Sequence, residues 1–273
     1  MTRRTVVTAC AVAVCVAVGG AVGYATTAGG TERAGTGRAE LPVQAYLLSY
    51  QQRDDLNRAY ERLVERCMRE RGAPVKALTH VRPPLKDFLE RRYGLTDLEQ
   101  AEQYGYGLPP SRDAAPPTAP KLTTAQRRVY DGASGGGQPR GCVGWAVRQL
   151  GDTSRARDTP FAMDLQRKTW DASAKDPRVV AAVARWSSCM SARGYHLSSP
   201  VDTTGKAAVG KAAERAQATA EVRCNRSSGV VRDWFAVEAA YQEESIERDK
   251  DTLIAERSAA LRVVGRARAV LDD

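Results

Sequence analysis

Apolar residues recur at helical spacing through most of this chain, and alternating strand patterns are almost absent. Over residues 44–71 they lie four, three and four residues apart, at Leu56, Tyr60, Leu63 and Cys67. This spacing places them on one helix face, with charged residues over the other faces. Gly72 follows where a left-handed C-terminal cap belongs, so the pattern predicts an amphipathic helix that ends there.

Shorter helices are predicted in the rest of the first half from capping and turn residues. We expect them over residues 85–92, 96–104, 123–130 and 142–150, the second opening with the capping box Thr96-x-x-Glu99. Five prolines between residues 109 and 120 predict an irregular surface loop.

The second half carries the longest helical pattern. Asp176-Pro177 supplies an N-cap and a first helical residue, and Gly194 ends that helix. An Ala-rich helix is expected over residues 206–223. Residues 230–271 contain no proline and a single glycine, which predicts a long terminal helix with a break near Ser245. Its apolar stripe comprises Val230, Trp234, Val237 and Tyr241, continued at heptad spacing by Ile246, Leu253, Ala260 and Ala267. The fold class expected is therefore all-α, with a helical N-half at 41–158 and a helical C-half at 159–273.

The N-terminus is typical of a membrane-targeting segment. Arg3 and Arg4 precede an uncharged run, and about 20 apolar residues in a helix span the hydrocarbon layer of a bilayer. Residues 1–25 are predicted to be a signal peptide or a single-pass transmembrane anchor, contacting the cytoplasmic membrane through residues 5–25. Lipidation at Cys10 is a third alternative. Residues 26–40, rich in Thr, Gly and Ala, are expected to form a flexible linker.

The motif Cys-Met-x-x-Arg-Gly occurs twice, at residues 67–72 and 189–194. Each copy is followed by one further cysteine, so outside the N-terminal segment there are four: Cys67, Cys142, Cys189 and Cys224. Four cysteines allow three pairings. We favour the local arrangement, Cys67–Cys142 and Cys189–Cys224, in an oxidising compartment. A zinc site fits poorly, because the chain has two histidines and no Cys-x-x-Cys.

The positive charge is spread along the chain. The formal net charge is +9, but residues 31–158 hold 21 basic and 16 acidic groups, and residues 159–273 hold 18 and 16. A nucleic-acid binder needs several Lys or Arg on one surface to displace counterions from phosphates. We therefore expect no nucleic-acid partner.

A family resemblance rests on short motifs in a fixed order. They are Arg92-Tyr93-Gly94-Leu95-Thr96-Asp97, Gly105-Tyr106-Gly107, Gly141-Cys142, Asp176-Pro177-Arg178-Val179 and Trp186-Ser187-Ser188-Cys189-Met190 through Gly194-Tyr195. The chain resembles, from about residue 45 to 271, a family of uncharacterised secreted or lipid-anchored helical proteins of actinobacteria. This resemblance implies an exported helical protein and brings no activity or catalytic residue with it.

Motifs that would indicate catalysis are mostly absent. The chain has no Gly-x-x-x-x-Gly-Lys loop, Gly-x-Ser-x-Gly elbow or His-Glu-x-x-His. We predict no cofactor, no metal and no catalytic residue. The alternative is a cell-envelope hydrolase that uses His80 or His196 as a general base between helices.

The function expected from sequence is therefore a non-catalytic binding module of the cell envelope, with its body outside the cytoplasmic membrane or secreted. Its partner would be an envelope protein or polymer. Aromatic residues near glycines and cysteines are the candidate binding surface: Tyr93, Tyr104, Tyr106, Trp145 and Trp186.

Overall fold

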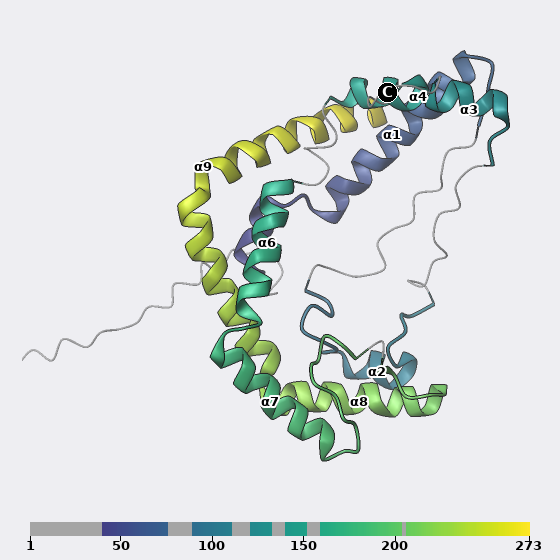
Figure 1. The fold of residues 1–273 in the computed structure, drawn as a ribbon. Coiled ribbons are helices and arrows are strands. Elements are labelled where there is room, and N and C mark those ends of the chain that lie inside the picture. Colours follow the sequence, from purple (N-terminus) through teal and green to yellow (C-terminus); the bar gives the residue numbers. More distant parts are fainter. Residues whose placement is uncertain (1–39, 76–88, 111–120, 133–139, 152–158, 204–205) are drawn as a thin grey trace, which may run out of the picture. The chain divides into compact units, whose positions relative to one another are not determined.

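The computed structural model describes residues 40–75, 89–110, 121–132, 140–151, 159–203 and 206–273. In these ranges the chain is helical and contains no β-strand (Figure 1). The elements are η1 (Pro42–Tyr46), α1 (Tyr50–Glu70), α2 (Leu98–Tyr104), α3 (Thr124–Asp131), α4 (Gly141–Leu150), α6 (Pro160–Ser173), α7 (Pro177–Ser191), α8 (Lys211–Ser228) and α9 (Val230–Asp272). The all-α prediction is confirmed. Residues 40–273 form one compact unit.

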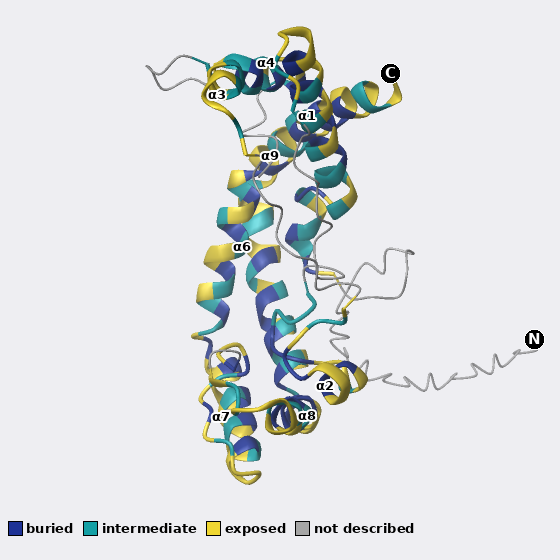
Figure 2. Ribbon diagram, turned by 90° about the vertical axis from the view of Figure 1, so that its right-hand side faces the viewer, coloured by how far each residue is buried: buried dark blue, intermediate teal, exposed yellow. Residues whose placement is uncertain are grey.

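The terminal helix α9 is the element on which most of the others pack. It contacts α1, α6, α7 and η1 along its length. Its φ/ψ angles leave the helical region at Asp249, so the break expected near Ser245 lies four residues further on. Three of the hydrophobic clusters include residues of α9. Each long helix carries both buried and exposed positions, as amphipathic packing requires (Figure 2).

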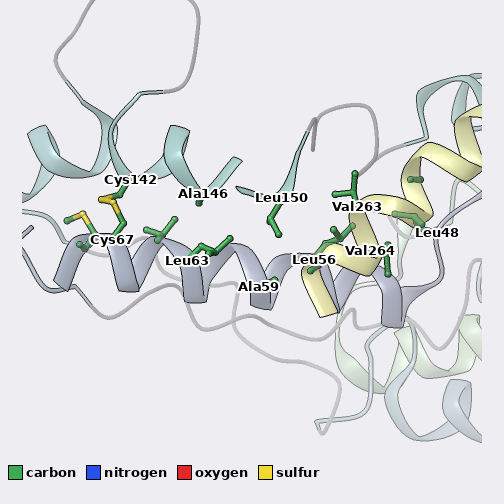
Figure 3. Close-up of a cluster of buried hydrophobic side chains, with 14 residues drawn as sticks. Leu48, Leu56, Ala59, Leu63, Cys67, Cys142, Ala146, Leu150, Val263 and Val264 are labelled. Carbon is green, nitrogen blue, oxygen red and sulfur yellow. A yellow bond between two sulfur atoms is a disulfide. The ribbon is translucent and has the colours of Figure 1, made fainter. Parts of the chain in front are cut away.

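The first cluster joins α1, α4 and the C-terminal part of α9 (Figure 3). Leu56, Leu63 and Met68 of α1 are at most 2 % exposed. Ala146 and Leu150 of α4 lie over this face, and the Cys67–Cys142 disulfide closes the α1–α4 contact. The small residues Ala59, Ala146, Ala260 and Ala267 are fully buried in the described structure. They allow close approach of helix backbones in a chain with few aromatic residues.

The second cluster joins α7, α8 and the N-terminal part of α9. Its centre is Trp186, which has no exposed surface, with Met190 and Val179 on the same face of α7. The Cys189–Cys224 disulfide links α7 to α8. Both predicted cysteine pairs are thus at bonding distance, with Cα atoms 5.6 Å apart in each. On the chain-entropy model, loops of these lengths stabilise the fold by roughly 4 kcal/mol each.

The two Cys-Met-x-x-Arg-Gly copies end their helices in the same way. Gly72 and Gly194 have φ of +69° and +84°, the left-handed conformation that the motif predicts. In each copy the residue after the glycine donates its backbone N–H to the methionine carbonyl, Ala73 to Met68 at 2.9 Å and Tyr195 to Met190 at 3.0 Å. Both methionines are fully buried. The repeat is therefore a Schellman-type helix end with a buried methionine and a bonded cysteine.

Several helix boundaries differ from the sequence predictions. The helix expected over 44–71 is divided into η1 and α1, and Ser49 caps α1 by accepting from the Gln52 backbone N–H. The N-cap of α2 is Asp97, so the capping box predicted between Thr96 and Glu99 does not form. Helix α8 begins at Lys211 rather than Lys206, because Gly210, with φ of +93°, precedes it. Helix α6 was not predicted from sequence.

The predictions for the N-terminus concern residues that the structure does not describe. The signal peptide or anchor at 1–25 and most of the linker at 26–40 lie outside the described residues, as does the first half of the helix expected at 85–92. The described half of that segment, residues 89–92, forms turns and not a helix. Within the described ranges, no helix combines the length and apolar character needed to cross a bilayer.

Replacing Gly194 with Val is expected to lower the free energy of unfolding by about 1 kcal/mol or more, because a β-branched residue resists positive φ. No atom lies within 4 Å of the position a Cβ would take, so the cost comes from backbone strain alone. Urea unfolding of the oxidised protein measures it.

The matched control is Arg193→Gln. The Arg193 guanidinium reaches the Cys189 carbonyl at 3.1 Å but is exposed, so its loss should cost only about 0.3–1 kcal/mol. A larger loss for Arg193→Gln than for Gly194→Val would contradict the capping role of the motif.

Candidate functional site

The five aromatic residues proposed from sequence do not form one surface. Tyr93 and Trp186 are buried in the second cluster, with 3 % and 0 % of their surface exposed. Tyr106 is 6 % exposed and lies in a different cluster, between α2 and α8. Trp145 is half-buried on α4 with the Arg66 guanidinium 5.5 Å from its ring centre. Tyr104 is the one exposed member of the five. Most of this set therefore builds the core.

Of the two candidate histidines, the structure describes only His196. His80 lies outside the described residues. His196 is exposed in the segment that follows α7, and no described serine, cysteine or carboxylate hydrogen-bonds to its ring. Among the described residues, no three His, Cys, Asp or Glu side chains come together in a way that could hold a metal ion.

A buried carboxylate organises the most elaborate polar cluster of the described structure. Glu238 of α9 has no exposed surface and accepts hydrogen bonds from three side chains. Arg92 donates hydrogen bonds to both carboxylate oxygens. Its Nε lies 3.0 Å from Oε2, and its Nη2 donates to Oε1. The Tyr93 hydroxyl donates to Oε2 at 2.7 Å, and Gln242 Nε2 donates to Oε1 at 2.9 Å. This bidentate pairing with two further donors satisfies the buried charge.

The same cluster connects three parts of the chain. Glu238 and Gln242 are one turn apart on α9, which turns both toward the core. Gln242 Oε1 also accepts the backbone N–H of Val43 in η1 at 3.0 Å. Arg92 and Tyr93 come from the segment before α2. Burial, together with the Glu238 charge, raises the pKa of the Tyr93 hydroxyl far above its usual range, so it remains a hydrogen-bond donor at all ordinary pH values.

An aromatic stack extends this cluster toward the surface. Trp170 of α6 stacks on Trp234 of α9, with ring centres 4.6 Å apart and planes 16° apart. Tyr93 lies 5.7 Å from both indole rings. The Arg92 guanidinium lies 4.6 Å from the Trp170 ring centre, so the arginine that neutralises Glu238 also makes a cation–π contact. Trp234 Nε1 donates to Ser173 Oγ at 2.9 Å, which satisfies the buried indole N–H.

Above this stack lies a shallow hollow of about 480 Å³. We call it the Trp170 hollow; it is lined by Arg92, Met163, Asp164, Gln166, Arg167 and Trp170. Met163 is 41 % exposed, and Asp164 pairs with Arg167 at 2.7 Å and with Lys168 at 2.6 Å. The lining thus combines two large apolar side chains, Met163 and Trp170, with three charged ones and an amide. Its openness to solvent suits contact with a partner surface more than enclosure of a small molecule.

A second buried acid lies between α8 and the segment before α2. Glu221 has no exposed surface, and its Oε1 accepts the Leu95 backbone N–H at 2.8 Å. Asn225, one turn later, donates to the Leu95 carbonyl at 2.6 Å. Burial raises the pKa of Glu221 despite these contacts. Among the described residues, Glu221 Oε2, Asn225 Oδ1 and the Tyr106 hydroxyl are buried and have no partner that meets hydrogen-bond geometry.

Sequence reasoning missed both buried acids. Glu238 falls between Val237 and Tyr241, within the apolar stripe of α9, and its position four residues after Trp234 was a signal that it faces the core. Trp170 offered no such signal, because the helix that holds it was itself not predicted.

Comparison with protein-family models, with curated proteins and with solved structures gave no significant match. The resemblance to exported actinobacterial proteins therefore stays a prediction from sequence motifs.

Replacing Glu238 with Ala is expected to lower the free energy of unfolding by about 3 kcal/mol or more, because the mutation leaves the Arg92 charge unpaired and largely buried. Denaturant unfolding measures the change. Glu247→Ala, at an exposed position of the same helix, is the control and should change it by less than about 0.5 kcal/mol. Equal effects would mean that the cluster around Glu238 contributes little to the fold.

The stability of the protein should depend on pH through Glu221. Its carboxyl binds a proton more tightly in the folded state, so this group favours folding below its unfolded pKa of 4.5. That contribution is lost as the pH rises through the higher folded value. Glutamine at position 221 cannot ionise, so the Glu221→Gln variant does not lose this contribution as the pH rises. The free energy of unfolding of the variant minus that of the unmodified protein should therefore increase from pH 4.5 to pH 8. Thermal melts across this range test it. An unchanged difference at every pH would show that Glu221 ionises normally when folded.

Proposed function

We propose that this chain is a non-catalytic binding module of the cell envelope, with residues 40–273 outside the cytoplasmic membrane. The main support for this location is the presence of two cysteine pairs at bonding distance. Disulfides of this kind form and persist in oxidising compartments outside the cytoplasm. The apolar run that follows Arg3 and Arg4 supports the same location, because positive residues stay on the cytoplasmic side.

A role in binding is favoured by the construction of the Trp170 hollow. Two of its lining side chains are held in place by buried neighbours: Trp170 stacks on Trp234, and Arg92 pairs with Glu238. Such support keeps the surface in one geometry before a partner arrives, which reduces the conformational entropy lost on binding. Tryptophan, methionine and arginine are enriched where protein partners meet, and the hollow contains all three. The partner that fits is an envelope protein which inserts an apolar side chain against Met163 and Trp170.

Export and binding can be tested together in intact cells. A reporter enzyme fused after Asp273, of a type that is active only outside the cytoplasm, should be active with the full chain and inactive when residues 1–25 are removed. Reporter activity without these residues, or none with them, would contradict the proposed location.

A photo-crosslinking amino acid in place of Met163 should then form a discrete adduct with an envelope protein. The matched control places the same group at Val180, which is 53 % exposed on α7 and outside the hollow. The adduct should be absent at Val180 and should weaken when Arg167→Glu reverses the charge of the rim. Equal adducts at Met163 and Val180 would argue against a binding site in the hollow.

A further inference from the structure

The C-terminal part of α9 has an exposed apolar face that none of the described elements covers. Ile254 and Leu261 are among the large hydrophobic residues exposed in the described structure, at 48 % and 41 %. They lie seven residues apart on one helix, so they share a face. The opposite face of the same segment is buried against α1 and α4 through Ala260, Val263, Val264 and Ala267.

Small exposed residues alternate with the two large ones along this face. Ile254, Ser258, Leu261 and Gly265 are spaced four, three and four residues apart, and all four are exposed. No atom lies within 4 Å of the position that a Cβ on Gly265 would take, so the surface there is open. Asp251 and Arg268 extend the same spacing by three residues at either end and are also exposed. This set of six residues is called the α9 stripe below.

We propose that the α9 stripe pairs, antiparallel, with the α9 stripe of a second copy of this chain. When two such helices run in opposite directions about a two-fold axis, Ile254 lies opposite the second copy's Gly265 and Ser258 opposite its Leu261. Each facing pair then matches a large side chain of one copy with a small residue of the other, so that the large side chain fills the space beside the small residue. The symmetry repeats each contact, as in an isologous dimer.

Charge favours this orientation over the parallel one. Antiparallel pairing brings the Asp251 carboxylate opposite the second copy's Arg268. In the described structure Arg268 uses Nε to bind Asp55 at 2.9 Å, while its side chain is 54 % exposed. Its terminal nitrogens remain available to a second carboxylate. Parallel pairing would instead place Asp251 against Asp251 and Arg268 against Arg268, which is repulsive.

The charge distribution along α9 is self-complementary over a longer range. Residues 243–251 contain five acidic and two basic side chains, whereas residues 262–268 contain three arginines and no acid. An antiparallel pair sets each acidic segment toward the basic segment of the other copy. Residues 251–268 rise about 27 Å as a helix, so the interface is small and the expected dissociation constant is of the order of 10 µM.

Cysteine crosslinking of the full chain tests the orientation directly. In a background with Cys10→Ser and Cys15→Ser, the double variant Ile254→Cys/Gly265→Cys should form a covalent dimer on mild oxidation after folding. Each single variant should stay monomeric on denaturing gels, because antiparallel pairing does not bring like positions together. Crosslinking by either single variant, or no crosslinking by the double variant, would overturn the proposal.

Light scattering over a concentration series tests the affinity. Leu261→Glu should weaken the dimer at least about tenfold, since it places a charge in the interface. At concentrations well below about 10 µM, where both proteins are monomeric, its melting temperature should equal that of the unmodified chain, because position 261 is exposed in the single chain. Val180→Glu, at an exposed apolar position on another helix, should leave the dimer intact. A chain that remains monomeric at concentrations well above about 10 µM would overturn the proposal.

Discussion

The buried charge of Glu238 is the constraint around which the rest of the described structure is arranged. A carboxylate with no access to water requires a cation and further donors, and α9 alone supplies only Gln242. The others come from the segment before α2, as Arg92 and Tyr93. One charged side chain on the last helix thereby fixes the path of a segment more than 140 residues earlier in the sequence. A hydrophobic residue at position 238 would avoid the desolvation penalty, but it would not select this particular segment.

Arg92 links that constraint to the surface. Its guanidinium donates to the Glu238 carboxylate and lies 4.6 Å from the centre of the Trp170 ring, so one side chain connects the buried acid to the aromatic stack. Lysine could supply the charge but neither the bidentate pairing nor the flat face. The Trp170 hollow is thus built on a rigid base, while the hydrophobic cluster around α1 and α4 is held by packing and a disulfide.

Sequence reasoning succeeded where a local rule determines the structure. The cap Asp176-Pro177, the left-handed Gly72 and Gly194 and the long α9 all follow from short-range patterns. The cysteine pairs lie 75 and 35 residues apart, and their pairing was chosen among three because it gives each half of the chain one bond. Sequence reasoning failed where the outcome depends on distant partners. Glu221 resembles a solvated helix residue until the segment that carries Leu95 is placed against it, and the position of Glu238 in the apolar stripe does not reveal that Arg92 and Tyr93 are its partners. The aromatic residues chosen as a binding surface were recognisable as important, but burial of Tyr93 and Trp186 gives them a role in the core.

The participation of α9 in three hydrophobic clusters also sets the order in which the chain can fold. The cluster of α1 and α4 needs residues 260–267, the cluster of α7 and α8 needs residues 230–237, and the cluster of η1 and α6 needs Leu253. None of these cores is complete until nearly the whole chain has left the ribosome. The apolar faces of α1, α6 and α7 that pack on α9 therefore stay uncovered until α9 itself has been synthesised, whereas the smaller cluster between α2 and α8 contains no α9 residue.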